Sequence, residues 1–216
     1  MKLTVPRSLR REEWLNYLHV DGEPDDALRR QMDEAERLLL GSVRPRGIYR
    51  VLSRSQVPED GFSIQKHLEG CDQSALLAVT AGTEIDALIR KWQTAGMAMA
   101  LLLDTGASVL VEQIADEAEA QLEAEITARA PGRFFTPRFS PGYGDYPLSC
   151  QRDLLTLVDA PRKIGLTLTA GNMMVPSKSI TALIGLSDVP VKGRLATCGE
   201  CVLREKCEFI KTGGHC

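Results

Sequence analysis

The sequence predicts an α+β fold in which helices flank a twisted, largely antiparallel β-sheet. Amphipathic helical stretches and short β-like stretches follow one another without the regular strand–helix–strand rhythm of a doubly wound sheet. The chain has 216 residues, of which 44% are apolar and 25% charged. This composition can build a normal hydrophobic core, and the length suits one large domain or one domain with a small appendage.

Residues 1–45 form the first predicted segment and are expected to be helical. A short helix is expected over SLRREEWLNYLHV, with Ser8 as its N-cap. A longer amphipathic helix is expected over residues 25–40 and should end at Gly41. Its apolar stripe consists of Leu28, Met32, Ala35 and Leu39.

Residues 46–190 form the second predicted segment, which contains the sheet. Strands are expected at residues 47–53, 62–65, 75–82, 163–169 and 179–186. Helices are expected at about 84–103, with Thr83 as N-cap, at about 107–129 and at 151–160. Gly106 marks either a break between the first two of these helices or a packing point.

The helix expected at 107–129 has an apolar and an acidic face. Its apolar positions are Leu110, Ile114, Ala118, Leu122 and Ile126, and its opposite face carries Glu112, Asp116, Glu119 and Glu123. Periodicity alone favours a solvated surface for any one of these carboxylates. On a helix that faces a cleft, however, such a carboxylate could accept hydrogen bonds from a ribose or an ammonium group.

Charge and motifs argue against several classes of function. The formal net charge is -3, and no basic cluster with interleaved aromatics is present, so nucleic-acid binding is not expected. The N-terminus has no apolar signal region, and the longest apolar run, Met97–Leu103, is far shorter than the roughly 20 residues of a membrane span. We therefore expect a cytoplasmic protein. The motifs of serine hydrolases, zinc proteases, P-loop enzymes and Rossmann dinucleotide-binding domains are also missing.

Residues 191–216 form the third predicted segment, a cysteine-rich tail. Four of the chain's six cysteines lie there with the spacing C-x2-C-x5-C-x8-C: Cys198, Cys201, Cys207 and Cys216. A C-x2-C pair can direct two thiolates at one metal ion, so these residues are candidate ligands of Zn²⁺ or of an iron–sulfur cluster. His215 is an alternative fourth ligand, and a tail of free thiols is the competing interpretation.

The loop RFSPGYGDYPLSC, residues 138–150, combines residue types that suit a small-molecule site. Gly142 and Gly144 permit close backbone approach or a positive φ, and the prolines stiffen the loop. Arg138 offers a planar fork for a carboxylate, and Tyr143 offers an aromatic ring with a hydroxyl. Composition alone is as consistent with an ordinary structural loop as with a site for a zwitterionic ligand.

Several motifs in this chain resemble one known family. R-F-S-P-G-Y resembles the R-P-A-P-G-Y signature of the activation domain of cobalamin-dependent methionine synthase, and KIGLTLTAGNMMVPSKSITALIGLS resembles a later stretch of that domain. Two upstream segments, HLEGCDQSALLAVTAG and LLLDTGASVLVEQIADE, resemble short stand-alone relatives. The resemblance covers roughly residues 10–190 in the right order. It departs after G-Y, where the family usually has P-A-C-P and this chain has GDYP, so the loop's outer contacts with cobalamin are the least secure part.

The resemblance implies a site for S-adenosylmethionine. It implies that Arg138 meets the methionine carboxylate, that Ser140, Gly142 and Tyr143 line the site, and that Tyr143 is the candidate catalytic residue. Glu112 corresponds to the acid on the helix that contacts the ligand, and Asp104 is a second, looser candidate acid.

The resemblance also implies which partners this chain needs. The D-x-H-x-x-G motif of cobalamin binding is missing, so the chain is expected to act in trans as an activation subunit rather than as an enzyme alone. Its expected partners are a separate corrinoid methyltransferase, namely the methionine synthase core, and an electron donor such as flavodoxin or ferredoxin. The alternative is a non-catalytic ligand-binding or scaffold protein of corrinoid metabolism whose tail docks a partner.

Overall fold

The computed structural model describes residues 1–20 and 22–191. The predicted metal ligands Cys198, Cys201, Cys207 and Cys216, and the alternative ligand His215, lie outside the described residues. Their role as ligands therefore stays a prediction.

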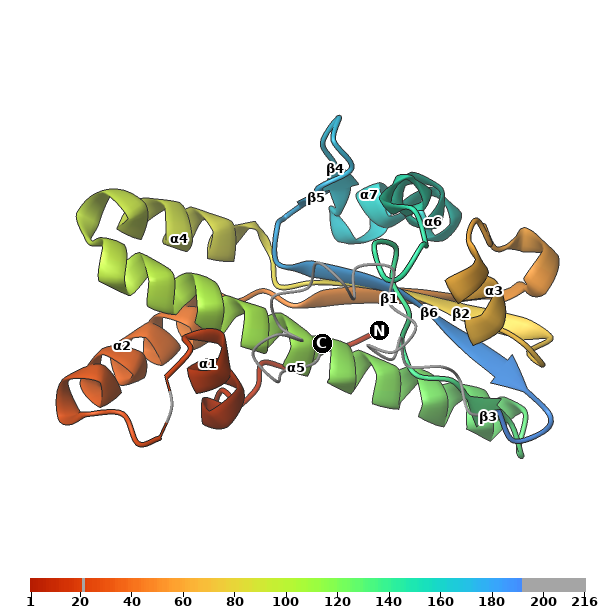
Figure 1. Cartoon of the computed structure of the whole chain (residues 1–216), viewed down its shortest axis with the longest axis horizontal. Helices are drawn as coiled ribbons and strands as arrows, with labels where there is room; N and C mark the ends of the chain where they lie inside the picture. The colour runs from red at the N-terminus through yellow and green to blue at the C-terminus, as the bar shows by residue number, and fades with distance from the viewer. Residues whose placement is uncertain (21, 192–216) are drawn as a thin grey trace. The chain divides into compact units, whose positions relative to one another are not determined.

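The described residues form a mixed fold of helices and antiparallel strands (Figure 1). The helices are α1 (Arg11–Tyr17), α2 (Asp26–Ser42), α3 (Phe62–His67), α4 (Thr83–Ala95), α5 (Met97–Arg129), α6 (Gln151–Val158) and α7 (Ala160–Ile164), with short 3-10 turns at Arg54–Gln56 and Leu148–Cys150. The strands are β1 (Arg46–Ser53), β2 (Gln73–Thr80), β3 (Phe134–Phe135), β4 (Thr167–Leu168), β5 (Met174–Val175) and β6 (Ser179–Ser187). One sheet has the order β1-β2-β6-β3, and β4 pairs with β5 in a separate hairpin. Strand β3 pairs with β6 and β4 pairs with β5, both antiparallel, which confirms the predicted fold class.

The chain divides into two compact units. Unit 1 comprises Met1–Ile48, Ala78–Gln121 and Ala160–Ile180, and unit 2 comprises Tyr49–Leu77, Leu122–Asp159 and the described part of Thr181–Cys216. Strands β1, β2 and β6 and helix α5 contribute residues to both units. The predicted division at residues 45 and 190 stays a prediction.

The N-terminal helices of unit 1 largely follow the predicted pattern. In α2, Met32, Ala35 and Leu39 of the predicted stripe are buried, and the Asp25 carboxylate caps the helix by accepting the Leu28 N–H at 2.7 Å. Helix α2 continues through Gly41 to Ser42 instead of ending at Gly41.

The predicted N-cap of the first helix is wrong. Helix α1 begins only at Arg11, and its N-cap is Arg10, which makes no side-chain cap. The residues around Ser8 are instead held by side chains from other helices: Gln113 donates to the Ser8 carbonyl at 3.0 Å, and Glu36 accepts the Leu9 N–H at 2.6 Å.

The predicted helix boundary near Gly106 is also wrong. The break lies at Gly96, where the chain turns sharply between α4 and α5 (Figure 1), and α5 runs unbroken through Gly106. A Cβ atom at position 106 would lie 2.6 Å from Cζ2 of Trp14 and 2.9 Å from Cδ1 of Leu39. Of the two alternatives, Gly106 is therefore a packing point and not a helix break. Because it has no side chain, the Trp14 indole can lie against α5.

Helix α5 passes a length-and-composition test for a membrane span. It contains an apolar stretch of 18 residues with at most two charged side chains, and 56% of that stretch is buried inside the protein. The predicted apolar positions Leu110, Ile114, Ala118, Leu122 and Ile126 are all buried. This pattern is that of a core helix of a globular domain, which can pass the same test.

Two predicted strands are wrong. Residues 62–65 lie in helix α3, because the first amides of that helix are capped by an acid that is distant in sequence, as described below. Of residues 163–169, only Thr167–Leu168 form a strand, while Lys163 and Ile164 end helix α7. Gly165 then takes a left-handed φ of 71°, which terminates the helix and sends the chain toward the hairpin.

Candidate functional site

The segment Arg138 to Tyr143, here called the signature loop, is fixed at its start to strand β6. Phe139 and Leu183 form an antiparallel bridge in which the two residues exchange backbone hydrogen bonds of 2.9 and 2.8 Å. The Phe139 side chain is buried, whereas Arg138 and Ser140 on either side are half-buried. In extended backbone, neighbouring side chains point to opposite sides, so Arg138 and Ser140 share the side opposite the buried Phe139.

Aromatic rings pack around Phe139. The His67 ring stacks on it with a centroid distance of 4.7 Å, and the Tyr143 ring meets it edge-on at 5.9 Å. The His67 Nε2 atom lies 2.9 Å from the Thr136 hydroxyl, which also accepts the Gly185 N–H at 2.8 Å. These contacts hold Tyr143 in place although 52% of its surface is exposed. An exposed but oriented tyrosine is available to a ligand.

The turn at Gly142 brings its exposed backbone to the surface. Gly142 donates to the Tyr146 carbonyl at 2.8 Å, and Tyr143 donates to the Ser140 carbonyl at 3.2 Å. Gly142 has a φ of 95°, a region that side-chain-bearing residues rarely adopt. The nearest atom to a Cβ built there is 3.8 Å away, so the turn leaves room for a ligand beside the backbone.

The following residues, GDYP, fix the turn to helix α3. Both carboxylate oxygens of Asp145 accept backbone amides, from Phe62 and from Ser63, each at 2.8 Å. Asp145 therefore caps the N-terminus of α3 from outside the helix, where unpaired N–H groups attract negative charge. The Ser63 amide and hydroxyl and the Phe62 amide together lower the pKa of Asp145 below its usual value.

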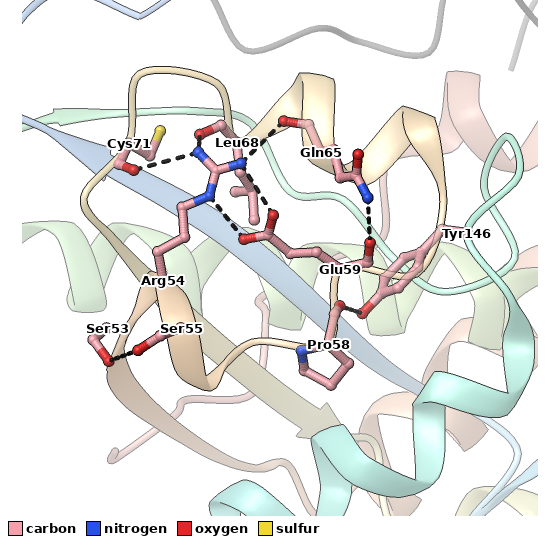
Figure 2. Close-up of polar contacts among 9 residues, drawn as sticks. All are labelled: Ser53, Arg54, Ser55, Pro58, Glu59, Gln65, Leu68, Cys71 and Tyr146. Atoms are coloured by element: carbon pink, nitrogen blue, oxygen red, sulfur yellow. Dashed lines mark hydrogen bonds and ion pairs between the residues drawn. The ribbon is translucent and has the colours of Figure 1, made fainter.

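Tyr146 is a second attachment of this segment. Its ring is buried, and its hydroxyl donates to the Pro58 carbonyl at 2.9 Å (Figure 2). Burial is the main cause that raises the pKa of Tyr146, so the phenol keeps its proton, and with it the hydrogen bond, into alkaline solution. Burial and the hydrogen bond to Asp60 likewise raise the pKa of the nearby Cys150 thiol to about 11, which makes it a packed thiol rather than a nucleophile.

Arg54 organises the chain that carries Pro58 (Figure 2). Its guanidinium forms a two-pronged ion pair with Glu59, with N–O distances of 2.8 and 3.1 Å. It also donates to three carbonyl oxygens at and beyond the end of α3, those of Gln65, Leu68 and Cys71. Residues 53–71 therefore form a cross-linked support for the signature loop within unit 2.

The structure places the predicted site residues in two groups. Arg138, Ser140, Gly142 and Tyr143 lie within six residues of one another in unit 2, and the Nη1 atom of Arg138 is buried. Glu112 and Asp104 belong to the part of α5 in unit 1, where Glu112 is half-buried and Asp104 is exposed.

Asp104 has a close cationic partner in unit 1. The Lys178 ammonium lies 2.9 Å from the Asp104 carboxylate and donates to the Ser108 hydroxyl at 3.0 Å. An amine of a ligand would have to share or displace this partner.

The chain is similar to known proteins in both sequence and fold. Residues 60–189, more than half of the chain, match the family described as Vitamin B12 dependent methionine synthase, activation domain. The chain belongs to this family.

A solved structure of an activation domain has the same fold. The MetH reactivation domain bound to AdoHcy aligns over 94% of this chain and 81% of its own, with a TM-score of 0.61 and 16% identity. A search of curated proteins finds no match. In this activation domain, no group of three His, Cys, Asp or Glu side chains within residues 1–20 and 22–191 is arranged to hold a metal ion.

Sequence reasoning missed the residues that support the signature loop of this activation domain. Asp145 and Tyr146 appeared only as a departure from the family pattern, and Arg54 carried no motif. A usable signal was the sequence DGFS at the start of α3, where the N-cap position is Gly61 and has no side chain to accept the first amides. A helix without its own cap needs acceptors from elsewhere in the chain.

Asp145→Ala is expected to lower the free energy of unfolding by about 1 kcal/mol, the usual cost of losing a helix cap. Because the folded-state pKa of Asp145 is lowered, its contribution is complete above the unfolded pKa of about 4 and is lost as pH falls through the folded pKa. The gap in melting temperature between wild type and variant should therefore shrink below about pH 4. Asp145→Asn, which keeps an acceptor oxygen, should lose less at neutral pH. Equal melting temperatures at pH 7 would contradict the capping role.

Proposed function

We propose that this activation domain binds S-adenosylmethionine through the signature loop. The methyl group of the bound S-adenosylmethionine is then transferred to cobalamin carried by a separate methionine synthase core. In the overall reaction, S-adenosylmethionine loses a methyl group and leaves as S-adenosylhomocysteine. The partner's cob(II)alamin gains that methyl group and one electron from an external reductant. The chain itself supplies binding and orientation rather than a covalent intermediate.

The observation that carries the proposal is the rigid, exposed turn at Gly142 and Tyr143 next to Arg138. The bridge at Phe139 and the cap at Asp145 fix both ends of this turn, so little order has to be gained when a ligand binds. Arg138 supplies a two-pronged donor for the methionine carboxylate. The exposed Gly142 backbone and the oriented Tyr143 ring are available for the remainder of the ligand.

Two acids on α5, Glu112 and Asp104, are the proposed partners for the ligand's ribose or ammonium groups. Glu112 is the first candidate, because the resemblance matches it to the helix acid that contacts the ligand. Asp104 is the looser match, and its carboxylate has a close cationic partner in Lys178. The pKa of Tyr17 in α1 is raised, mainly by burial and to a smaller extent by the negative charge of Glu112.

The wider biochemical setting is proposed on the same basis. The chain would work in the cytoplasm with a corrinoid methyltransferase, and a flavodoxin or ferredoxin would deliver the electron. The cysteine-rich tail would hold Zn²⁺ or an iron–sulfur cluster, and a cluster there could relay that electron. Metal analysis and a visible spectrum of anaerobically purified protein distinguish the two, because only a cluster colours the protein.

Calorimetric titration with S-adenosylmethionine is the direct test of the proposal. We expect one site per chain, with S-adenosylhomocysteine competing for it. Addition of the methionine synthase core and a reductant should then convert cob(II)alamin to methylcobalamin. Absence of binding would overturn the proposal. Tight binding without methyl transfer to any corrinoid protein would favour the ligand-binding or scaffold function.

A further inference from the structure

A small basic pocket lies in unit 1, in a part of the chain that the proposed function does not use. It has a volume of about 310 Å³, near the lower end of the roughly 300–1,000 Å³ typical of ligand pockets. Its wall is formed by the residues around the start of β1 and the end of α7: Met1, Pro45, Arg46, Gly47, Ile48, Lys163 and Ile164. All of these residues belong to unit 1.

The charge of this pocket is one-sided. Among the residues that the structure describes, Arg46 and Lys163 line it, and no carboxylate does. Across the part of the chain that the structure describes, neither side chain forms an ion pair with an Asp or Glu. By contrast, Arg10, Arg11, Arg29, Arg54 and Arg133 all form such pairs. Two cations that share a concave site without a protein counterion attract an anion.

The backbone around the pocket is held in position. A Cβ at Gly47 would lie 2.7 Å from Leu3 and 3.1 Å from Val79, so this end of β1 is tightly packed. A Cβ at Gly165 would lie 3.4 Å from Nη1 of Arg46, so the glycine lets the guanidinium lie close to the backbone after α7. Arg46 and Lys163 are both exposed, and the Arg46 fork lies beside the backbone at Gly165.

We propose that Arg46 and Lys163 form a binding site for a phosphate or pyrophosphate group. A guanidinium fork matches two phosphate oxygens at once, and a lysine ammonium adds a point charge that satisfies a third. The pocket volume of about 310 Å³ is sufficient for a phosphate or pyrophosphate group. Free inorganic pyrophosphate and the diphosphate of a nucleotide present the same chemistry to the site.

A structural role for the two cations is the competing explanation. Lys163 lies in the last turn of α7, where the carbonyl ends of a helix attract positive charge. This explanation predicts that Lys163→Gln lowers stability and leaves anion affinity unchanged. The binding proposal predicts that Lys163→Gln weakens anion binding and leaves stability unchanged.

The test is a titration of the full chain, free of S-adenosylmethionine, with inorganic pyrophosphate and separately with ADP at low ionic strength. We expect saturable binding of pyrophosphate by wild type. Arg46→Gln and Lys163→Gln should each weaken this binding about tenfold, the usual loss for one charge-assisted contact. Equal affinity for ADP assigns the site to the phosphate group alone, and tighter binding of ADP assigns it to a nucleotide.

Arg30→Gln is the matched control, because Arg30 is an exposed arginine on α2 that lies outside the pocket wall. Equal losses in Arg30→Gln and Arg46→Gln would indicate general charge attraction and overturn the proposal. Undiminished binding by the Arg46→Gln, Lys163→Gln double variant would overturn it as well, as would no binding by wild type. Arg138→Ala should leave pyrophosphate affinity unchanged, so failure here and failure of the proposed function are distinguishable.

Discussion

Arg138→Ala is expected to weaken S-adenosylmethionine binding by about 100-fold, which corresponds to about 3 kcal/mol. Truncation of Arg138 removes the two-pronged partner that we propose for the ligand's carboxylate. The backbone bridge at Phe139 and the cap at Asp145 do not use the Arg138 side chain, so the loop should keep its conformation. Isothermal titration calorimetry measures the affinity, and circular dichroism and the melting temperature report on the fold.

Arg138→Lys is the control that separates charge from geometry. Lysine keeps the positive charge but loses the planar fork, so binding should be weakened less than in Arg138→Ala and should become more sensitive to salt. A ligand that lacks the carboxylate should bind wild type and Arg138→Ala with similar affinity. Unchanged affinity of Arg138→Ala for S-adenosylmethionine would remove the arginine from the site.

Elements whose stability depends on their own apolar pattern were predictable from the sequence. In α2 and α5, the apolar residues repeat at helical spacing, and the structure buries the core members of both stripes. Strand β6 coincides closely with the predicted strand at 179–186, because a continuous run of apolar and β-branched residues is buried there. In these elements, local preference and burial favour the same structure.

Elements that depend on distant residues were not predictable in this way. The stretch FSIQ has good strand composition, yet its first amides bind Asp145, which lies more than 80 positions later in the sequence, and the segment becomes α3. The contact of Gly106 with Trp14 also joins residues far apart in the chain, so a pattern within α5 could not distinguish a helix break from a packing point.

The candidate site was also only partly predictable from the sequence. The resemblance identified the signature loop because R-F-S-P-G-Y keeps the residue types of the family signature in the same order. It was silent about GDYP, where this chain departs from the family. That segment contains Asp145 and Tyr146, which attach the loop to α3 and to Pro58. Supporting residues can vary between relatives because several side chains can supply the same cap or hydrogen bond.

Trp14→Ala is expected to lower the free energy of unfolding by about 3–5 kcal/mol, the largest effect on stability that we predict. The Trp14 side chain is fully buried, and its indole N–H donates to the Thr105 hydroxyl at 3.0 Å. Its ring fills the space that the missing Cβ of Gly106 leaves open. Alanine would leave a cavity between α1 and α5. Urea denaturation followed by circular dichroism measures the change.

Gly106→Ala tests whether this loss arises from contact of the indole with α5. In wild type, the added methyl group would overlap the Trp14 ring, so a cost of overpacking of about 1–3 kcal/mol opposes a gain of about 1 kcal/mol in helix propensity. In the Trp14→Ala background the overlap with the ring is absent, and the Leu39 methyl group, 2.9 Å from the added Cβ, can move into the space that the indole leaves. Gly106→Ala should then be neutral or stabilising, and this change of sign is the signature of direct contact. The same cost in both backgrounds would show that Trp14 stabilises unit 1 by another route.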